Sequence, residues 1–68
     1  MLDRKKLAER LRVERARKKV TQTEVAEATG TTAVAICNYE NGNRTPTLEK
    51  LNALADYYEV TTDYLLGK

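Results

Sequence analysis

The sequence contains no histidine, no tryptophan and no phenylalanine, and it has one cysteine and one proline. Without histidine there is no Ser-His-Asp triad, no Cys-His nucleophile and no imidazole ligand for zinc. A single cysteine forms neither an internal disulfide nor a thiolate metal site, so nothing indicates an oxidising compartment. We therefore expect a protein that is not an enzyme and that uses no metal and no other cofactor.

Long apolar runs are also missing. None approaches the ~18 residues of a membrane-spanning helix, and the segment MLDRKKLAERLR lacks the apolar core of a signal peptide. The 68 residues are 41% hydrophobic and 32% charged, which is typical of one small globular domain, here residues 1–68, with a thin core. We expect a cytoplasmic protein with no membrane partner.

The net charge of +2 hides a strong asymmetry along the chain. Residues 1–20 hold nine basic and three acidic side chains, whereas residues 21–41 hold three acidic and no basic ones. A basic segment on a small domain indicates a polyanionic partner, most often nucleic acid. The alternative is a solvated helix that is rich in arginine and lysine.

The spacing of apolar residues predicts an all-α fold of five short helices. No stretch alternates with a period of two, so strands are not expected. The first helix runs from about Asp3 to Lys18 and places Leu7, Ala8 and Leu11 on one arc. Arg15 projects onto the same arc, where a charge needs a partner.

The next two helices are short and closely spaced. A capping box over residues 21–24, with Thr21 at the N-cap and Glu24 three residues later, opens a helix that ends at Gly30. Thr32 then caps a helix that runs from Ala33 to about Asn41 and turns Ile36 and Tyr39 inward.

Two further helices complete the chain. Thr47 caps a helix with the strongest apolar stripe of the sequence, formed by Leu48, Leu51, Leu54, Ala55 and Tyr58. Thr61 or Thr62 caps a last short helix that carries Leu65 and Leu66 and ends at Gly67.

Two short helices joined by a turn of about three residues that contains glycine predict a helix-turn-helix over about residues 21–41. Steep crossing requires a small residue in the first of these helices, which Ala26 supplies, and the turn requires a positive φ, which Gly30 supplies. The alternative is the helical hairpin of any small helical protein.

At this point the sequence resembles the lambda-repressor-like, Cro-type helix-turn-helix family, from about Leu7 to Gly67. The motif residues are Thr21, Gln22, Glu24, Val25, Ala26, Gly30, Thr32, Ile36, Tyr39, Glu40, Asn41, Gly42, Arg44, Pro46 and Leu48. The match continues through Leu51, Leu54, Ala55, Tyr58, Val60, Asp63, Tyr64, Leu65, Leu66 and Gly67. The resemblance implies a compact five-helix domain that binds specific DNA sequences, usually as a homodimer, in a phage or bacterial transcription regulator.

The resemblance also implies roles for single residues. Gln22 is similar to a phosphate-contacting glutamine at the start of the second helix, where free N–H groups favour an anion; the alternative is an exposed polar residue. Contacts to backbone phosphates are further expected around Asn41, Gly42 and Asn43, with Arg44 nearby as a phosphate-contacting or minor-groove base. The alternative for Arg44 is a solvated loop charge.

A structural ion pair between Arg15 and Glu40 is implied in the same way. Lys19 and Glu59 stand where the family often has glycine after a helix, so they either adopt the left-handed conformation at a cost of roughly 1 kcal/mol each or end their helices differently. Thr29 replaces a usual aliphatic residue.

The base-reading positions implied by the resemblance are Thr32, Ala33, Val34, Cys37 and Asn38. Many relatives have Gln, Arg or Ser at such positions. Ala33, Val34 and Cys37 cannot form bidentate hydrogen bonds but can touch thymine methyl groups, whereas Asn38 can bind adenine N6 and N7. Alternatively, Ala33 and Val34 only fill space, or this apolar face binds a protein. Cys37 is either a passive contact or a redox switch.

The leading hypothesis is a sequence-specific DNA-binding transcriptional regulator, a repressor that binds a near-palindromic operator on double-stranded DNA as a homodimer. Dimerisation is expected through Tyr64, Leu65 and Leu66, although one leucine of the pair is expected to fold back onto Leu51 and Leu54. The alternative is an antitoxin-like or anti-regulator interaction module whose main partner is a protein.

Overall fold

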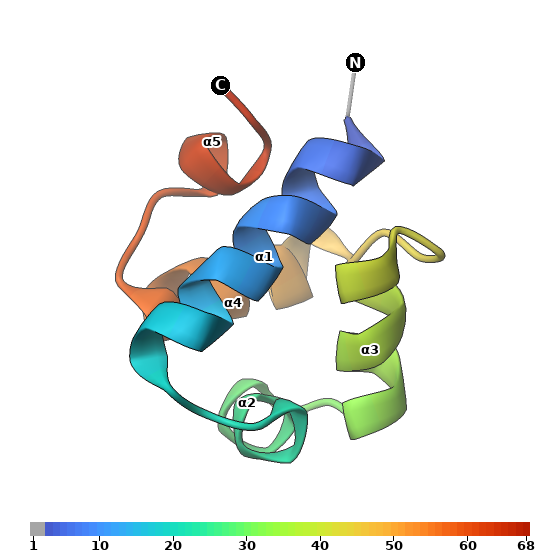
Figure 1. The fold of residues 1–68 in the computed structure, drawn as a ribbon, viewed down its shortest axis with the longest axis vertical. Coiled ribbons are helices and arrows are strands. Elements are labelled where there is room, and N and C mark those ends of the chain that lie inside the picture. Colours follow the sequence, from blue (N-terminus) through green and yellow to red (C-terminus); the bar gives the residue numbers. More distant parts are fainter. Residues whose placement is uncertain (1–2) are drawn as a thin grey trace.

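The computed structural model describes residues 3–68, which form five helices and no strand. They are α1 (Arg4–Lys18), α2 (Gln22–Thr29), α3 (Ala33–Asn41), α4 (Leu48–Tyr58) and α5 (Thr62–Leu65). In Figure 1, α1 crosses in front of α4, with α3 on one side and α5 on the other. The predicted all-α fold and its five helices are confirmed.

Every helix begins at a side chain that accepts a hydrogen bond from the backbone N–H three residues later. The first-turn N–H groups of a helix have no partner within the helix, so a capping oxygen stabilises the start by about 1 kcal/mol. In α2 both bonds of the predicted capping box form, Glu24 N to Thr21 Oγ1 at 3.1 Å and Thr21 N to Glu24 Oε1 at 3.0 Å. The N-caps are Asp3, Thr21, Thr32, Thr47 and Thr61.

Four helices end at a residue in the left-handed conformation. Gly30 after α2 and Gly42 after α3 have φ of 75° and 77°. Lys19 after α1 and Glu59 after α4 adopt the same conformation, with φ of 60° and 59°. Because a Cβ is strained there, each of these two positions costs roughly 1 kcal/mol.

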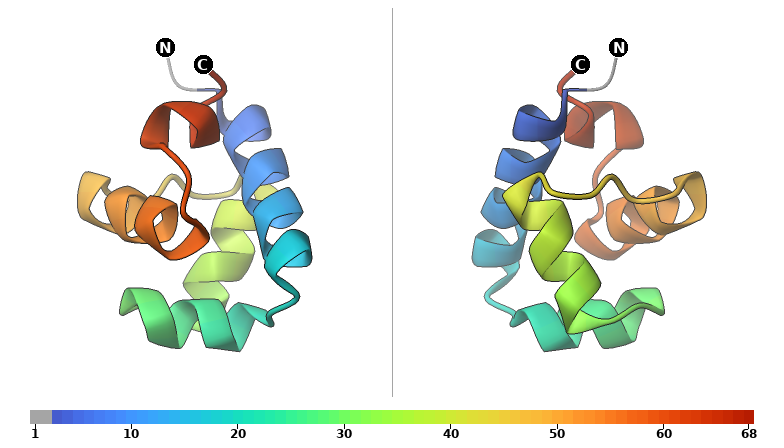
Figure 2. Two further views of the ribbon diagram at one scale, coloured as in Figure 1. Left: turned by 90° about the vertical axis from the view of Figure 1, so that its left-hand side faces the viewer. Right: turned by 90° about the vertical axis from the view of Figure 1, so that its right-hand side faces the viewer.

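One apolar core joins all five helices. Its largest fully buried side chains come from every element: Leu7, Leu11, Val25, Ile36, Leu54 and Leu65. α1 packs against α3, α4 and α5, while α2 packs against α3 and α4, as the two side views of Figure 2 show. The predicted inward positions of Ile36 and Tyr39 are confirmed.

Leu48 lies differently from the expectation, whereas Leu65 follows one of the two that were stated for it. Leu48, predicted on the buried stripe of α4, is 72% exposed. It is the first residue of the helix, one turn before the buried Leu51, so the stripe enters the core only from Leu51 onward. Leu65 is fully buried, because α5 turns it into the core beside α1 and α4. It is therefore the leucine of the Leu65–Leu66 pair that folds back into the core, as was expected for one of the two, and it is not available to the expected dimer surface.

No helix within residues 3–68 is long and apolar enough to cross a membrane.

Candidate nucleic-acid interface

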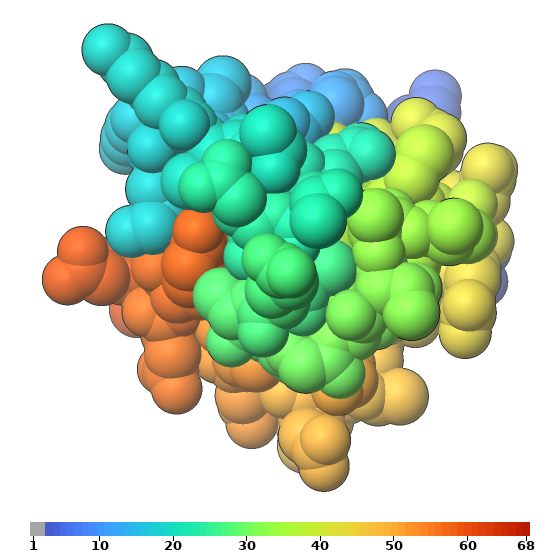
Figure 3. Space-filling view, turned by 90° about the horizontal axis from the view of Figure 1, so that it is seen from below, coloured from blue at the N-terminus to red at the C-terminus, as the bar shows by residue number. Residues whose placement is uncertain are grey.

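The helix-turn-helix is formed by α2 and α3. The carbonyl of Ala26, a buried residue of α2, accepts the N–H of Gly30 and that of Thr31. These bonds and the left-handed Gly30 end α2 sharply and turn the chain into α3. Seen from below in Figure 3, α2 and α3 lie side by side on one face of the molecule. The right panel of Figure 2 shows α3 on the outside, with α2 beneath it.

α3 has one buried and one outward side. Its buried residues are Ala35, Ile36, Tyr39 and Glu40. Of the positions predicted to read bases, Thr32, Ala33 and Val34 precede these buried residues, and Cys37 and Asn38 come between Ile36 and Tyr39. Val34 is 70% exposed, and Ala33, Cys37 and Asn38 are half-buried. The outer side of α3 therefore offers an apolar side chain and an amide to whatever lies against it.

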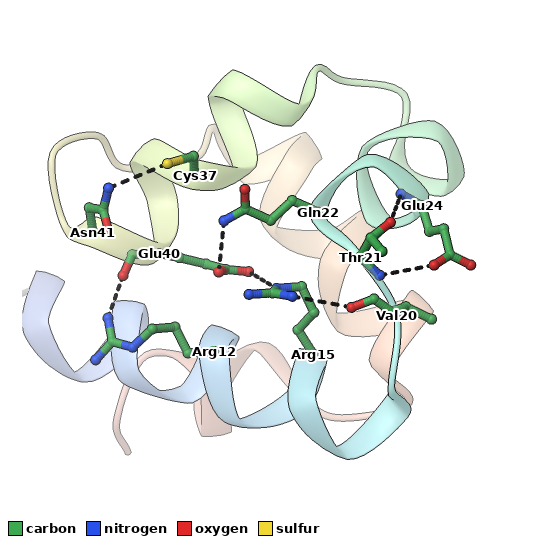
Figure 4. Close-up of polar contacts among 9 residues, drawn as sticks. All are labelled: Arg12, Arg15, Val20, Thr21, Gln22, Glu24, Cys37, Glu40 and Asn41. Atoms are coloured by element: carbon green, nitrogen blue, oxygen red, sulfur yellow. Dashed lines mark hydrogen bonds and ion pairs between the residues drawn. The ribbon is translucent and has the colours of Figure 1, made fainter.

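Glu40 is the centre of a polar network between three helices (Figure 4). Its side chain is 3% exposed, and Arg15 Nε donates to Oε2 at 2.8 Å. Arg15 Nη1 also donates to the carbonyl of Val20 at 3.2 Å. The expected ion pair is thus present, and its hydrogen bond to Glu40 raises the pKa of Arg15.

The same carboxylate holds Gln22. The side-chain Nε2 of Gln22 donates to Glu40 Oε1 at 3.2 Å, and the side chain is half-buried. Since an amide nitrogen has two hydrogens, one remains for a further acceptor. Glu40 therefore fixes the direction in which Gln22 points at the start of α2. The sequence predicted a phosphate contact for Gln22, with an exposed polar residue as the alternative, and it did not predict this contact with Glu40.

The turn after α3 is tightly organised by its backbone. With Gly42 at φ 77°, the N–H groups of Asn43 and Arg44 both donate to the carbonyl of Asn38, at 3.0 and 3.3 Å. The side chains of Asn41, Asn43 and Arg44 are exposed. The predicted phosphate-contacting residues of this turn therefore lie at the carboxyl end of α3, whereas Gln22 lies at the start of α2.

Cys37 is not isolated on α3. Its Sγ accepts a hydrogen bond from Asn41 Nδ2 at 3.4 Å, one helical turn further along (Figure 4). This contact orients the amide of Asn41 at the beginning of the turn.

A second buried carboxylate, that of Glu14, was not predicted from the sequence. Glu14 is 4% exposed and accepts a hydrogen bond from the hydroxyl of Tyr64 at 2.9 Å. That bond raises the pKa of Tyr64, and the guanidinium of Arg10 lies 4.5 Å from the centre of the Tyr64 ring. The burial of Glu14 could have been predicted, because Glu14 follows Leu7 and Leu11 at helical spacing. Tyr64, expected at a dimer interface, is thus tied to α1.

These features define a class of protein. A short α2, a turn through a left-handed glycine and an α3 with one buried and one outward side make up an all-α helix-turn-helix domain. The family model described as "Helix-turn-helix domain" matches residues 6–65, and the chain belongs to this family.

Named relatives and solved structures agree with that membership. The HTH-type transcriptional regulator ImmR of Bacillus subtilis is 40% identical over 62 residues, which cover 91% of this chain and 49% of ImmR. The cryptic phage CTXphi transcriptional repressor RstR of Vibrio cholerae is 35% identical over 63 residues, covering 93% of this chain and 56% of RstR. The chain thus spans about half the length of these curated relatives.

The fold is also that of a solved repressor. The P22 c2 repressor, crystallised with synthetic operator 9T, superimposes with a TM-score of 0.88 at 33% identity, over 90% of this chain and 92% of the repressor chain.

Proposed function

We propose that this chain is the sequence-specific DNA-binding part of a bacterial or phage transcriptional repressor, acting in the cytoplasm. The observation that carries the proposal is the division of α3 into a buried side and an outward side between two polar ends, Gln22 on α2 and the turn after α3. An α-helix fits the major groove when its outer side is free to meet base edges. The operator complex of the similar P22 c2 repressor supports this assignment.

Contacts to the DNA backbone come from both ends of the motif. At the start of α2, the remaining amide hydrogen of Gln22 and the free backbone N–H groups of the first turn donate to a phosphate. The turn contributes Asn41, Gly42, Asn43 and Arg44. Such contacts fix the position of α3 on the duplex but do not depend on base sequence.

Contacts to bases come from the outward side of α3. The exposed isopropyl group of Val34 packs against thymine C5-methyl groups, and Ala33 beside it does the same. Asn38 forms paired hydrogen bonds with adenine N6 and N7, while Thr32 and Cys37 border the contact. Half-sites are therefore expected to be rich in A·T pairs.

The protein binds a near-palindromic operator as a homodimer, which places two copies of α3 about 34 Å apart on one side of the duplex. Leu65 is buried, and the hydroxyl of Tyr64 is hydrogen-bonded to Glu14. Leu66, at the end of α5, is half-buried, and its exposed part forms the contact between the two protomers.

A second candidate is a module whose main partner is a protein, favoured by the apolar Val34 at 70% exposure. The two functions differ in their response to salt. DNA binding weakens steeply with salt because counterions are released from phosphates, whereas an apolar protein contact does not.

The test is fluorescence anisotropy with labelled duplexes at several salt concentrations, followed by selection of bound sites from random-sequence DNA. We expect salt-dependent binding to any duplex and a tighter, A·T-rich selected site. Replacing thymine by uracil at a selected position should weaken the wild-type protein but not Val34→Ser, because only thymine carries the methyl group. Absence of duplex binding at low salt would exclude the DNA-binding function.

A further inference from the structure

An open basic hollow lies between the amino-terminal half of α1 and the end of α3. Its volume is about 510 Å³, and neither the base-reading side of α3 nor the start of α2 contributes to it. We call it the basic hollow; its lining residues are Arg4, Lys5, Ala8, Glu9, Arg12, Asn41 and Gly42.

The charges around the basic hollow are mainly positive. Arg4, Lys5 and Arg12 face one acidic residue, Glu9, whose carboxylate lies 3.8 Å from the ammonium of Lys6 outside the hollow. Arg4 and Lys5 are exposed and form no ion pair with any residue of the described chain. The hollow therefore presents a net positive charge that its own neighbours do not neutralise.

One of these cations is held in place. A guanidinium N–H of Arg12 donates to the backbone carbonyl of Glu40 at the end of α3 (Figure 4). Guanidinium has five N–H donors, so several remain for an anion. The start of α1 also lies close to the turn after α3, because a Cβ at Gly42 would lie 3.9 Å from the carbonyl oxygen of Arg4. The beginning of α1 and the turn after α3 thus form one continuous surface.

We propose that the basic hollow binds a backbone phosphate of the same DNA strand that the turn after α3 contacts. Asn41 and Gly42 belong to both the hollow and that turn, so a strand that reaches them passes directly in front of Arg4, Lys5 and Arg12. Charge complementarity identifies the ligand as a phosphodiester. The inference rests on the proposed function and adds α1 to the DNA-contacting elements.

The test compares Arg4→Gln/Lys5→Gln with the control Arg17→Gln/Lys18→Gln. Both pairs remove one arginine and one lysine charge from adjacent exposed positions, and the control pair lies at the carboxyl end of α1, beside Tyr58 and Glu59 of α4 and its C-cap, and lines no part of the basic hollow. Circular dichroism and thermal unfolding first establish that both variants fold. Binding to a duplex of random sequence is then measured from about 0.05 to 0.2 M salt.

Loss of one phosphate contact per protomer lowers the magnitude of the slope of log K against log salt by about 0.9 for a bound monomer and by about 1.8 for the homodimer. We expect this change and about tenfold weaker binding for Arg4→Gln/Lys5→Gln, and a slope unchanged from wild type in the control. On the selected site, an uncharged methylphosphonate at one backbone position should weaken the wild-type protein and not Arg4→Gln/Lys5→Gln.

The failures are distinguishable. Equal slopes of log K against log salt for Arg4→Gln/Lys5→Gln and the control, with duplex binding intact, would overturn the proposal that the basic hollow binds a phosphate. The proposed function would then still stand. A methylphosphonate scan without any position that separates wild type from the variant would also overturn the proposal for the basic hollow. A wild-type protein that binds no duplex would overturn both.

Discussion

Replacing Arg15 is expected to lower the unfolding free energy strongly, because it leaves the buried carboxylate of Glu40 without its cation. Arg15→Met keeps the aliphatic stem but leaves a carboxylate that is 3% exposed with Gln22 as its remaining side-chain donor. Breaking a buried ion pair from one side costs about 3 kcal/mol. For a domain of this size, whose unfolding free energy is on the order of 5 kcal/mol, that is most of the stability.

The reverse change is expected to cost less. Glu40→Gln leaves Arg15 with a side chain that is 28% exposed and therefore partly hydrated, so the loss should be about 1.5 kcal/mol. In the double variant no buried charge is left unpaired. Its loss should fall short of the sum of the single losses by about 1.5 kcal/mol, which is the coupling energy of the pair.

The measurement is urea unfolding followed by far-ultraviolet circular dichroism, because the chain has no tryptophan. Arg4→Met is the matched control: it removes the same group from the same helix at an exposed site that forms no ion pair within the described residues, at a cost of at most about 0.5 kcal/mol. If Arg15→Met cost no more than Arg4→Met, or if the cycle showed no coupling, the pair would not stabilise the fold.

Three further outcomes are expected. Lys19→Gly and Glu59→Gly should each raise the unfolding free energy by about 1 kcal/mol by relieving a left-handed side chain; unchanged urea midpoints would argue against this strain. Burial, with the charge of Glu40, raises the pKa of Tyr58; because the folded state then keeps a proton that the unfolded chain loses, stability should fall as pH rises above about 10, and less steeply in Tyr58→Phe. A wild-type protein as stable at pH 11 as at pH 9 would refute this. Leu66→Glu should lower both the mass in solution and the operator affinity, and no change in either would place the dimer interface elsewhere.

The local parts of the fold were predictable because their causes are local. A threonine before an apolar stretch caps a helix through its own hydroxyl, so the starts at Thr21, Thr32 and Thr47 follow from a few neighbouring residues. The glycine turns after α2 and α3 follow from the φ that such turns require.

The remaining features depend on contacts between distant residues. Tyr64 lies 50 positions from Glu14, and Gln22 lies 18 from Glu40, so no spacing rule joins them. Leu48 has the correct helical phase for the core, but phase alone does not tell how far along α4 the core begins. Likewise, the basic charge of α1 was visible in the sequence, whereas the hollow beside the turn after α3 required the packing of α1 on α3.

The most direct test asks whether the outer side of α3 reads bases. Wild type, Asn38→Ala and Arg44→Ala are titrated against the selected duplex and each of its single-base variants. We expect Arg44→Ala to bind every duplex more weakly by a similar factor, and Asn38→Ala to lose about 1–3 kcal/mol on the selected site and little on duplexes altered at one A·T pair. A uniform loss for Asn38→Ala across all duplexes, with discrimination between bases intact, would contradict base reading by this side chain.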